Sequence, residues 1–428
     1  MKTRKRTILA IVGILLVTAI FGAVIKQQRK GNTTFNDAIF SLDRSEQAIL
    51  KKQGNDSGYL CFTALEPRST VAMEFRARFE MEQQDEAPIV SLQYSTDQKN
   101  WQDFIVDQTV VTLENAGDKV YFRGNNLEGL AKRTKIDDKV QICFNRYILT
   151  GRVSGGGNIM SLLDAENFEE LSSVPKWAFV FLFDGCDSLT VAPALPATKL
   201  AEGCYDGMFE DCDSLAVAPE LPATKLAECC YEFMFCDCDA LAIAPELPAT
   251  ELAEGCYDWM FWSCDSLAVA PKLPATKLAE WCYQNMFEDC YSLTTAPELP
   301  AMELAEWCYM EMFSGCDSLT VASELPATKL AGGCYEGMFE GCTSLTTAPE
   351  LPATELSERC YAQMFDGCTA LKSVTIGLES FAGIPYGATK GWLDGVAENG
   401  TFTWAGGNSC DECGVSTIPE GWVIVSAK

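Results

Sequence analysis

Apolar and polar positions follow two different patterns along the chain. Between residues 57 and 160, short runs rich in β-branched and aromatic residues are separated by turn-forming segments such as Ser95-Thr96-Asp97. We expect an antiparallel, all-β sandwich-like domain here, which either binds sugars or proteins on its loops or spaces the following region from a membrane. Its predicted strands are 59–65, 71–80, 89–94, 108–113, 119–123 and 140–151.

From residue 195 onward the pattern repeats every 26 residues. A degenerate, more apolar copy at 169–194 precedes the regular ones, so we assign 161–194 to an N-terminal capping repeat. A unit of this length cannot bury its apolar face alone, and neighbouring copies are therefore predicted to stack. Seven copies cover 195–376 and begin at Leu195, Leu221, Leu247, Leu273, Leu299, Leu325 and Leu351.

Within each copy the apolar residues recur at every fourth position, which favours a short helix. Cys204 and Met208 form one stripe and Tyr205 and Phe209 an adjoining one, with Thr198 as the expected N-cap. A short strand is predicted to follow, before the prolines. One helix and one strand per repeat predict an α/β solenoid of the leucine-rich-repeat type. Residues 377–428 are expected to form a C-terminal cap, with a helix at 386–399 and strands at 400–404 and 421–426.

The first thirty residues have the pattern of an export signal. An uncharged apolar run at 8–25 lies between two basic clusters, and eighteen helical residues span about 27 Å. Residues 1–30 therefore predict either a transmembrane signal-anchor through 8–25 or a cleaved signal peptide. Both alternatives export the rest of the chain, in which 31–56 is expected to be a polar tether.

Composition and charge narrow the range of functions. The chain has no histidine, which excludes Ser-His-Asp and Cys-His catalytic sets and imidazole metal ligands. Its net charge of −28 disfavours nucleic acid as a partner. Of this charge, −23 lies in 195–376, which is typical of a solvated acidic face; weak calcium binding around Glu210 and Asp211 is an alternative. Because these carboxylates recur in copy after copy, they mark no single active site, and we predict no enzyme, cofactor or metal.

The 21 cysteines fall mainly into two columns of the repeat. One column runs from Cys204 to Cys360 and the other from Cys186 to Cys368, and both are expected to be buried free thiols. Cys229 and Cys236 interrupt this order on the outer side of the predicted helix. They indicate either an intermolecular disulfide or chance surface substitutions.

Four further cysteines are candidates for disulfides. Cys61 and Cys143 fall in the first and last predicted strands of the sandwich, where they would join its two sheets. Cys410 and Cys413 lie in a glycine-rich loop and favour a local disulfide over a redox motif, because no thioredoxin-like context surrounds them.

The string Met-Phe-x-x-Cys-x-Ser-Leu, with Leu-Pro-Ala-Thr between its copies, resembles the BspA-like leucine-rich-repeat surface proteins of bacteria. The motif is clearest at Met208-Phe209 with Cys212 and Leu215, and the resemblance covers about 169–428. It implies display at the cell surface and binding of host or bacterial macromolecules without catalysis. The family has no shared functional residues to transfer to this sequence.

Departures from the repeat supply the candidate site. The outer stripe of the predicted helix is mostly glycine and acidic residues, but four copies carry large aromatic residues there. We expect these either to form an exposed patch that binds a protein or glycan, or to pack between helices. The residues are Phe233, Trp259, Trp262, Trp281 and Trp307.

The predicted function is therefore that of an exported, adhesion-like repeat protein. We expect it at the cell surface or in the envelope, anchored or secreted, with an extracellular or host protein or glycan as its partner. The alternatives are a structural stalk or envelope component without a discrete ligand, and a carbohydrate-active enzyme.

Overall fold

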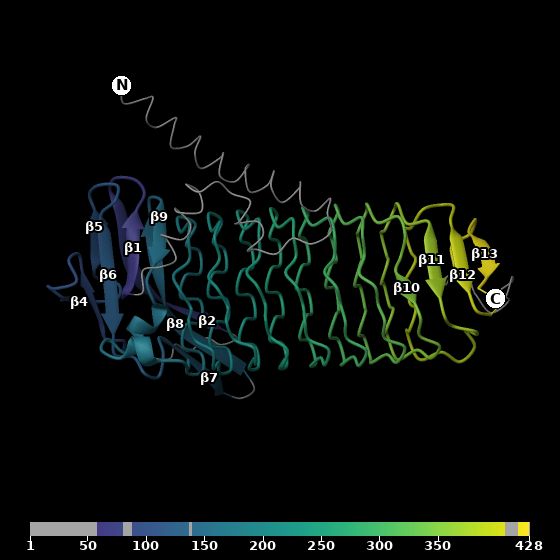
Figure 1. The fold of residues 1–428 in the computed structure, drawn as a ribbon, viewed down its shortest axis with the longest axis horizontal. Coiled ribbons are helices and arrows are strands. Elements are labelled where there is room, and N and C mark those ends of the chain that lie inside the picture. The colour runs from purple at the N-terminus through teal and green to yellow at the C-terminus, as the bar shows by residue number, and fades with distance from the viewer. Residues whose placement is uncertain (1–57, 80–87, 137–138, 407–417, 428) are drawn as a thin grey trace, which may run out of the picture.

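The computed structural model describes residues 58–79, 88–136, 139–406 and 418–427. These residues form two antiparallel sheets followed by a row of stacked coils that leads to the C-terminal strands (Figure 1). Parallel bridges join residues one repeat apart, such as Val191 with Val217, so each repeat forms one coil. A single hydrophobic cluster extends from the sheets through the coils to Trp422, and the two regions therefore share a core.

The two sheets occupy the region in which the sequence predicts a sandwich. Their strands are β1 (Leu60–Ala64), β2 (Ser69–Phe79), β3 (Leu92–Ser95), β4 (Gln102–Phe104), β5 (Val110–Leu113), β6 (Lys119–Gly124), β7 (Ala131–Ile136), β8 (Lys139–Thr150) and β9 (Val153–Gly156). One sheet has the order β4-β3-β6-β1-β9 and the other β5-β2-β8-β7. Phe62 and Phe122 of the first sheet meet Tyr147 of the second, with ring centroids 5.0 and 5.3 Å apart. The sequence pattern missed β4, β7 and β9.

The predicted α/β solenoid, with a helix in each repeat, is wrong. The described residues contain no α-helix; their only helical segments are the 3-10 turns η1 (Ile159–Leu162) and η2 (Phe168–Glu170). Where a repeat was expected to contain a short strand, neighbouring coils are joined by an isolated β-bridge, such as the one between Ile243 and Val269.

The predicted membrane-crossing helix has no counterpart in the described part of the chain. No helix there is long and apolar enough to cross a membrane. The transmembrane or signal segment predicted at 8–25 lies outside the described residues.

A chain of four-residue turns takes the place of each predicted helix. In residues 203–211, the backbone has positive φ at every fourth residue, with values of 58° at Gly203, 56° at Gly207 and 56° at Asp211. We call such a segment a turn ribbon. The equivalent ribbons are 177–185, 229–237, 255–263, 281–289, 307–315, 333–341, 359–367 and 387–395.

Hydrogen bonding between coils explains why the ribbon forms. Alternate N–H groups bond within the same coil, as Cys204 does to the carbonyl of Ala201, while the others bond to the next coil, as Tyr205 does to Cys230, each at 3.2 Å. Apolar residues at every fourth position fit both a helix and a turn that repeats every four residues. An isolated short helix is marginal in water, whereas the ribbon's backbone groups are satisfied by its neighbour, so stacking decides the conformation.

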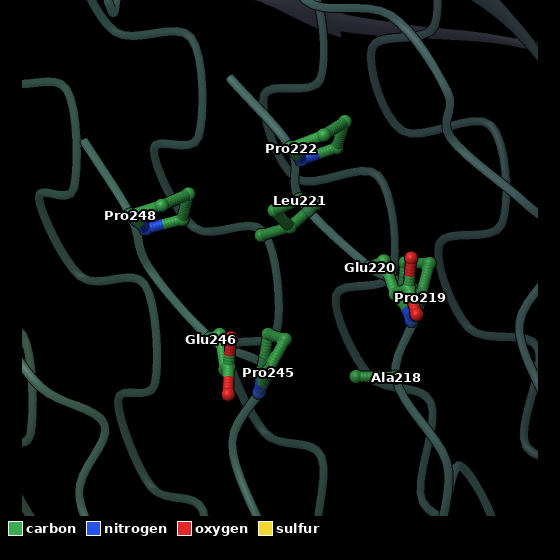
Figure 2. Close-up of a pocket in the computed structure, with 8 residues that line it drawn as sticks. All are labelled: Ala218, Pro219, Glu220, Leu221, Pro222, Pro245, Glu246 and Pro248. Carbon is green, nitrogen blue, oxygen red and sulfur yellow. The ribbon is translucent and has the colours of Figure 1, made fainter. Parts of the chain in front are cut away.

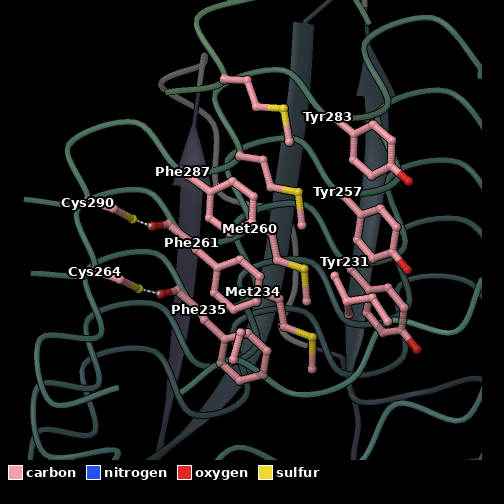
Figure 3. Packing of buried hydrophobic residues seen from close by; sticks show 14 of the residues in the cluster. Tyr231, Met234, Phe235, Tyr257, Met260, Phe261, Cys264, Tyr283, Phe287 and Cys290 are labelled. Atoms are coloured by element: carbon pink, nitrogen blue, oxygen red, sulfur yellow. Dashed lines mark hydrogen bonds between the residues drawn. The ribbon is translucent and has the colours of Figure 1, made fainter. Parts of the chain in front are cut away.

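The inward side chains of the ribbons form continuous ladders (Figure 3). Tyr231 stacks on Tyr257 at 5.8 Å and Phe235 on Phe261 at 5.6 Å, with rings nearly parallel. The thiol of Cys264 donates to the carbonyl of Phe235 at 3.1 Å. The cysteines of both columns are buried free thiols, which confirms that prediction. Each aromatic pair contributes about 0.5–1.5 kcal/mol beyond its burial.

The sandwich covers the first coil, and a parallel sheet lies at the other end of the row. The N–H of Gly155 in β9 donates to the carbonyl of Val191 at 2.9 Å. The parallel sheet comprises β10 (Glu350–Leu351), β11 (Ser373–Ile376), β12 (Thr401–Trp404) and β13 (Val423–Ser426). The helix predicted at 386–399 is wrong, because 387–395 is one more turn ribbon; its fully buried Trp392 stacks on Tyr361.

Candidate functional site

The outer sides of the turn ribbons form one face of the coil row, which we call the ribbon face. Four of the five predicted aromatic residues occupy its positive-φ positions, with φ between 52° and 57°; these are Phe233, Trp259, Trp281 and Trp307. Trp262 lies three residues after Trp259 on the same ribbon. Such a φ is uncommon for bulky side chains and costs roughly 1–2 kcal/mol per residue. Packing of the ladders holds the backbone in this shape.

The five aromatic residues are only partly exposed. The Phe233 ring stacks on Trp259 at 5.8 Å, and Trp259 meets Trp262 edge to face at 5.4 Å. Trp307 leans over the next coil, where any Cβ on Gly333 would collide with its ring. Trp281 is the most open of the five, with 36% of its surface exposed. The sequence left two alternatives, an exposed patch and rings packed between neighbouring units, and each describes part of this surface.

Carboxyl groups lie among these rings in a low-dielectric setting. Burial, with a smaller contribution from Glu232, raises the pKa of Asp258 to about 9. Burial also raises the pKa of Glu288 to about 7, although this side chain accepts a hydrogen bond from Asn285 Nδ2 at 2.6 Å. The middle of the ribbon face thus combines aromatic rings with acids that lack a cationic partner among the described residues.

At the first ribbons, part of the sheet formed by β2, β8 and β7 lies along the same face (Figure 1). We call the part that contains Arg78, Arg146 and Arg133 the extension. The guanidinium of Arg133 lies 4.4 Å from the ring centroid of Trp177, which has positive φ like the aromatic residues further on. Arg133 also approaches Glu202 of the next coil, with Nη1 and Oε1 3.5 Å apart. An arginine of the sandwich thus rests between a ring of one coil and a carboxylate of the next.

A second arginine of this extension makes the same kind of contact. Arg78 lies 3.9 Å above the ring centroid of Phe181 and forms two hydrogen bonds with Glu210, at 2.9 and 3.1 Å. Arg146 pairs with Asp184 at 2.8 Å. Cation–π contact and a bidentate carboxylate pair together fix the extension on the face.

This contact between sandwich and coils was not predicted from the sequence. Trp177 and Phe181 belong to the degenerate copy, whose apolar run was interpreted only as a cap. They occupy the same columns of the repeat as Trp281 and Phe233, and this register could have revealed them. Nothing local to Arg78 or Arg133 marks either residue as a partner.

The acidic residues near Glu210 form a cluster, but arginines already occupy it. Among the described residues, Asp184, Glu210 and Asp211 place one carboxylate oxygen each within 4.8 Å of one another. Arg78 pairs with Glu210, and Arg146 with Asp184, so two of the three carboxylates already have a cationic partner. We therefore assign no calcium site here.

The disulfide candidates lie apart or outside the described residues. Cys61 lies between Leu60 and Phe62 of β1, whose side chains belong to the shared core, so strand alternation turns Cys61 to the opposite face of its sheet. Cys143 lies in β8 of the other sheet, on the same face of that strand as Tyr147. This geometry gives no support to a disulfide across the sandwich. Cys410 and Cys413 lie outside the described residues.

The two cysteines that interrupt the columns are protonated thiols. Burial and the Glu232 carboxylate raise the pKa of Cys229, which is half-buried. Burial and Asp237 raise the pKa of Cys236, whose thiol donates to Asp237 Oδ2 at 3.3 Å and which is 2% exposed. Neither setting favours a reactive thiolate.

On another side of the coils, the proline-rich segments leave a shallow pocket of about 200 Å³ (Figure 2). Neighbouring coils contribute matching residues, such as Pro222 and Pro248, and Glu220 and Glu246. Because the pocket follows from the repeat itself, it carries no distinctive chemistry. The aromatic and acidic part of the ribbon face is the stronger candidate.

Comparison with known proteins supplies no further assignment: no family model, curated protein or solved structure matches the chain.

Proposed function

We propose that this chain is an exported, non-catalytic binding protein that captures a macromolecular partner on the ribbon face. The observation that carries the proposal is the grouping of Phe233, Trp259, Trp262, Trp281 and Trp307 on one face of adjoining coils, with Trp281 open to solvent. Large aromatic residues dominate binding hot spots, and a partner would bury the surface that they leave exposed. The resemblance to BspA-like surface proteins agrees with such a role.

The test is capture of the full-length protein on arrays of host-matrix proteins and glycans. The informative variant combines Trp259→Gly and Trp281→Gly, because glycine occupies the same columns at Gly207 and Gly203 and accepts their positive φ. We expect this variant to fold normally and to lose capture. The matched control, Tyr291→Ser, removes an aromatic ring that is 44% exposed beyond the ribbon, and it should retain capture.

Three outcomes would reject the proposal. Capture that survives the double variant would place binding elsewhere on the chain. Silence on both arrays, together with self-association, would favour the structural stalk, whereas turnover of a glycan would favour the enzyme.

A further inference from the structure

The molecule contains an internal example of what the ribbon face binds. Arg78 of β2 and Arg133 of β7 both face Ile142 of β8 in the strand register, so the three side chains form one row across the sheet. Each arginine rests on a ring of the first ribbon and pairs with a glutamate of the next coil. Two arginines that project side by side from two strands of one sheet, with β8 between them, thus fit this face.

The ring and carboxylate that hold Arg133 recur later in the row. Trp281 and Glu306 occupy the positions of Trp177 and Glu202 four coils further on, and the two tryptophans share the same backbone conformation, with φ of 56° and 58°. Glu306 is exposed and Trp281 is the most open ring of the stripe. No lysine or arginine among the described residues pairs with Glu306.

The ring and carboxylate that hold Arg78 recur as well. Trp259 and Glu288 occupy the positions of Phe181 and Glu210 three coils further on. Both are half-buried, and Glu288 has no cationic partner among the described residues. This second pair lies one coil before Trp281, so the two pairs are offset along the row. A strand that used both would cross the ribbons obliquely.

Charge favours the same kind of occupant. Residues 195–376 carry −23 of the net charge, and the acids of the ribbon face repel one another. Near the far end, Arg359 relieves this repulsion by pairing with Glu336, which is 3% exposed, through Nε and Oε2 at 2.8 Å. The ribbons between 229 and 341 contain no lysine or arginine of their own. A cationic partner would be attracted to them and steered toward them.

We propose that Trp259, Glu288, Trp281 and Glu306 bind an extended, arginine-bearing segment of a partner protein, in the way that Trp177, Glu202, Phe181 and Glu210 hold Arg133 and Arg78. This inference rests on the proposed function and names the chemistry of its partner. A planar guanidinium can stack on an indole while it pairs with a carboxylate, which an ammonium group does less well.

The test measures binding of a labelled peptide that alternates arginine and threonine to the full-length protein by fluorescence anisotropy. Two further peptides replace arginine with lysine or with neutral citrulline. We expect the arginine peptide to bind most tightly, the lysine peptide more weakly and the citrulline peptide not at all. Equal binding of the arginine and citrulline peptides, or of the arginine and lysine peptides, would overturn the proposal.

Variants locate the site. Trp281→Gly and Glu306→Gln should each weaken binding of the arginine peptide about tenfold. Glu251→Gln removes the same charge from an exposed residue that pairs with Lys225 away from the ring pairs, so it should change affinity little. Equal losses in Glu306→Gln and Glu251→Gln would reduce the effect to general charge and reject the proposed site.

The same peptide separates this inference from the proposed function. Array capture that depends on Trp259 and Trp281, but that the arginine peptide fails to displace, would reject the arginine chemistry and leave the binding function standing. Absence of capture on every array would reject the binding function itself.

Discussion

The inward and outward sides of the turn ribbons differ in how far their residues vary between copies. On the inward side, tyrosine and phenylalanine recur coil after coil and stack at nearly constant spacing. On the outward side, a single column holds Gly203, Cys229, Gly255, Trp281 and Trp307 in successive coils. Packing against identical neighbours restricts the inward side, whereas the outward side is free to differ from coil to coil. Distinctive chemistry is therefore expected where the copies disagree.

The inward side should be the most sensitive to substitution. Phe261→Ala removes one ring from the middle of a ladder and leaves a cavity bounded by two coils. We expect a loss of about 3–5 kcal/mol in the free energy of unfolding, measured by chemical denaturation. The exposed control Tyr291→Ala should lose less than about 0.5 kcal/mol. Equal effects of the two substitutions would contradict the distinction between the sides.

Buried acids on the outward side should make stability depend on pH. Since the pKa of Asp258 is about 9 in the fold and about 4 in the unfolded chain, the folded state holds an extra proton between these values. Stability therefore falls as pH rises from 4 to 9, by at most about 1.4 kcal/mol per pH unit for this group. Asp258→Asn should flatten that part of a melting-temperature profile.

Glu232 and Glu288 are present in both proteins, so the difference between the two profiles reports the titration of Asp258 together with its coupling to these two carboxylates. Parallel profiles for the variant and the native chain would show that Asp258 does not hold that proton.

The contact between sandwich and ribbon face should be weaker than the ladders. Arg78→Ala removes a cation–π contact and the pairing with Glu210, together worth about 1–2 kcal/mol. We expect faster amide hydrogen exchange in β2 and β7 and little change in the coils beyond 255. Lys132→Ala, next to Arg133 but on the opposite face of β7, serves as the control. Faster exchange throughout the coils would mean that the extension supports the whole row.

Removal of an outward ring should have the smallest effect on stability. Trp281→Gly loses partly exposed surface but relieves a positive φ, so the net change should stay within about 1 kcal/mol. Trp281→Ala keeps a Cβ at the same φ and should be less stable than the glycine variant by about 1 kcal/mol. The reverse order in thermal melts would show that the ring, and not the backbone, dominates this position.

The sequence predicted the stacking of repeats and the inward placement of residues such as Tyr205, Phe209 and Cys212, because periodicity and apolar character report burial directly. It failed on the backbone. A four-residue spacing suits a helix when one copy is considered alone, and only the recurrence of glycine at positions such as Gly203 and Gly207 indicates positive φ. The hydrogen bonds that favour the ribbon belong to pairs of coils.

The candidate site was predicted in part. The same spacing placed four of the five aromatic residues on an outer face for either backbone, since positions four apart stay on one side of both a helix and a ribbon. The fifth, Trp262, follows Trp259 by three residues. Their partial burial could not be predicted, because it depends on which residue the next coil presents, as Gly333 does beneath Trp307. The contacts of Arg78 depend on tertiary structure, with Glu210 132 residues away in the chain.

The ladders and inter-coil hydrogen bonds are alike at successive junctions, so nothing inside the row sets how many coils it contains. The sandwich and Trp392 lie at its two ends, and a coil inserted between them would meet surfaces that it already matches. The gain or loss of a whole repeat would therefore lengthen or shorten the row without a new kind of junction. Each such event would shift the order of glycine, acid and aromatic ring along the ribbon face, and so alter the chemistry of that surface while leaving the core unchanged.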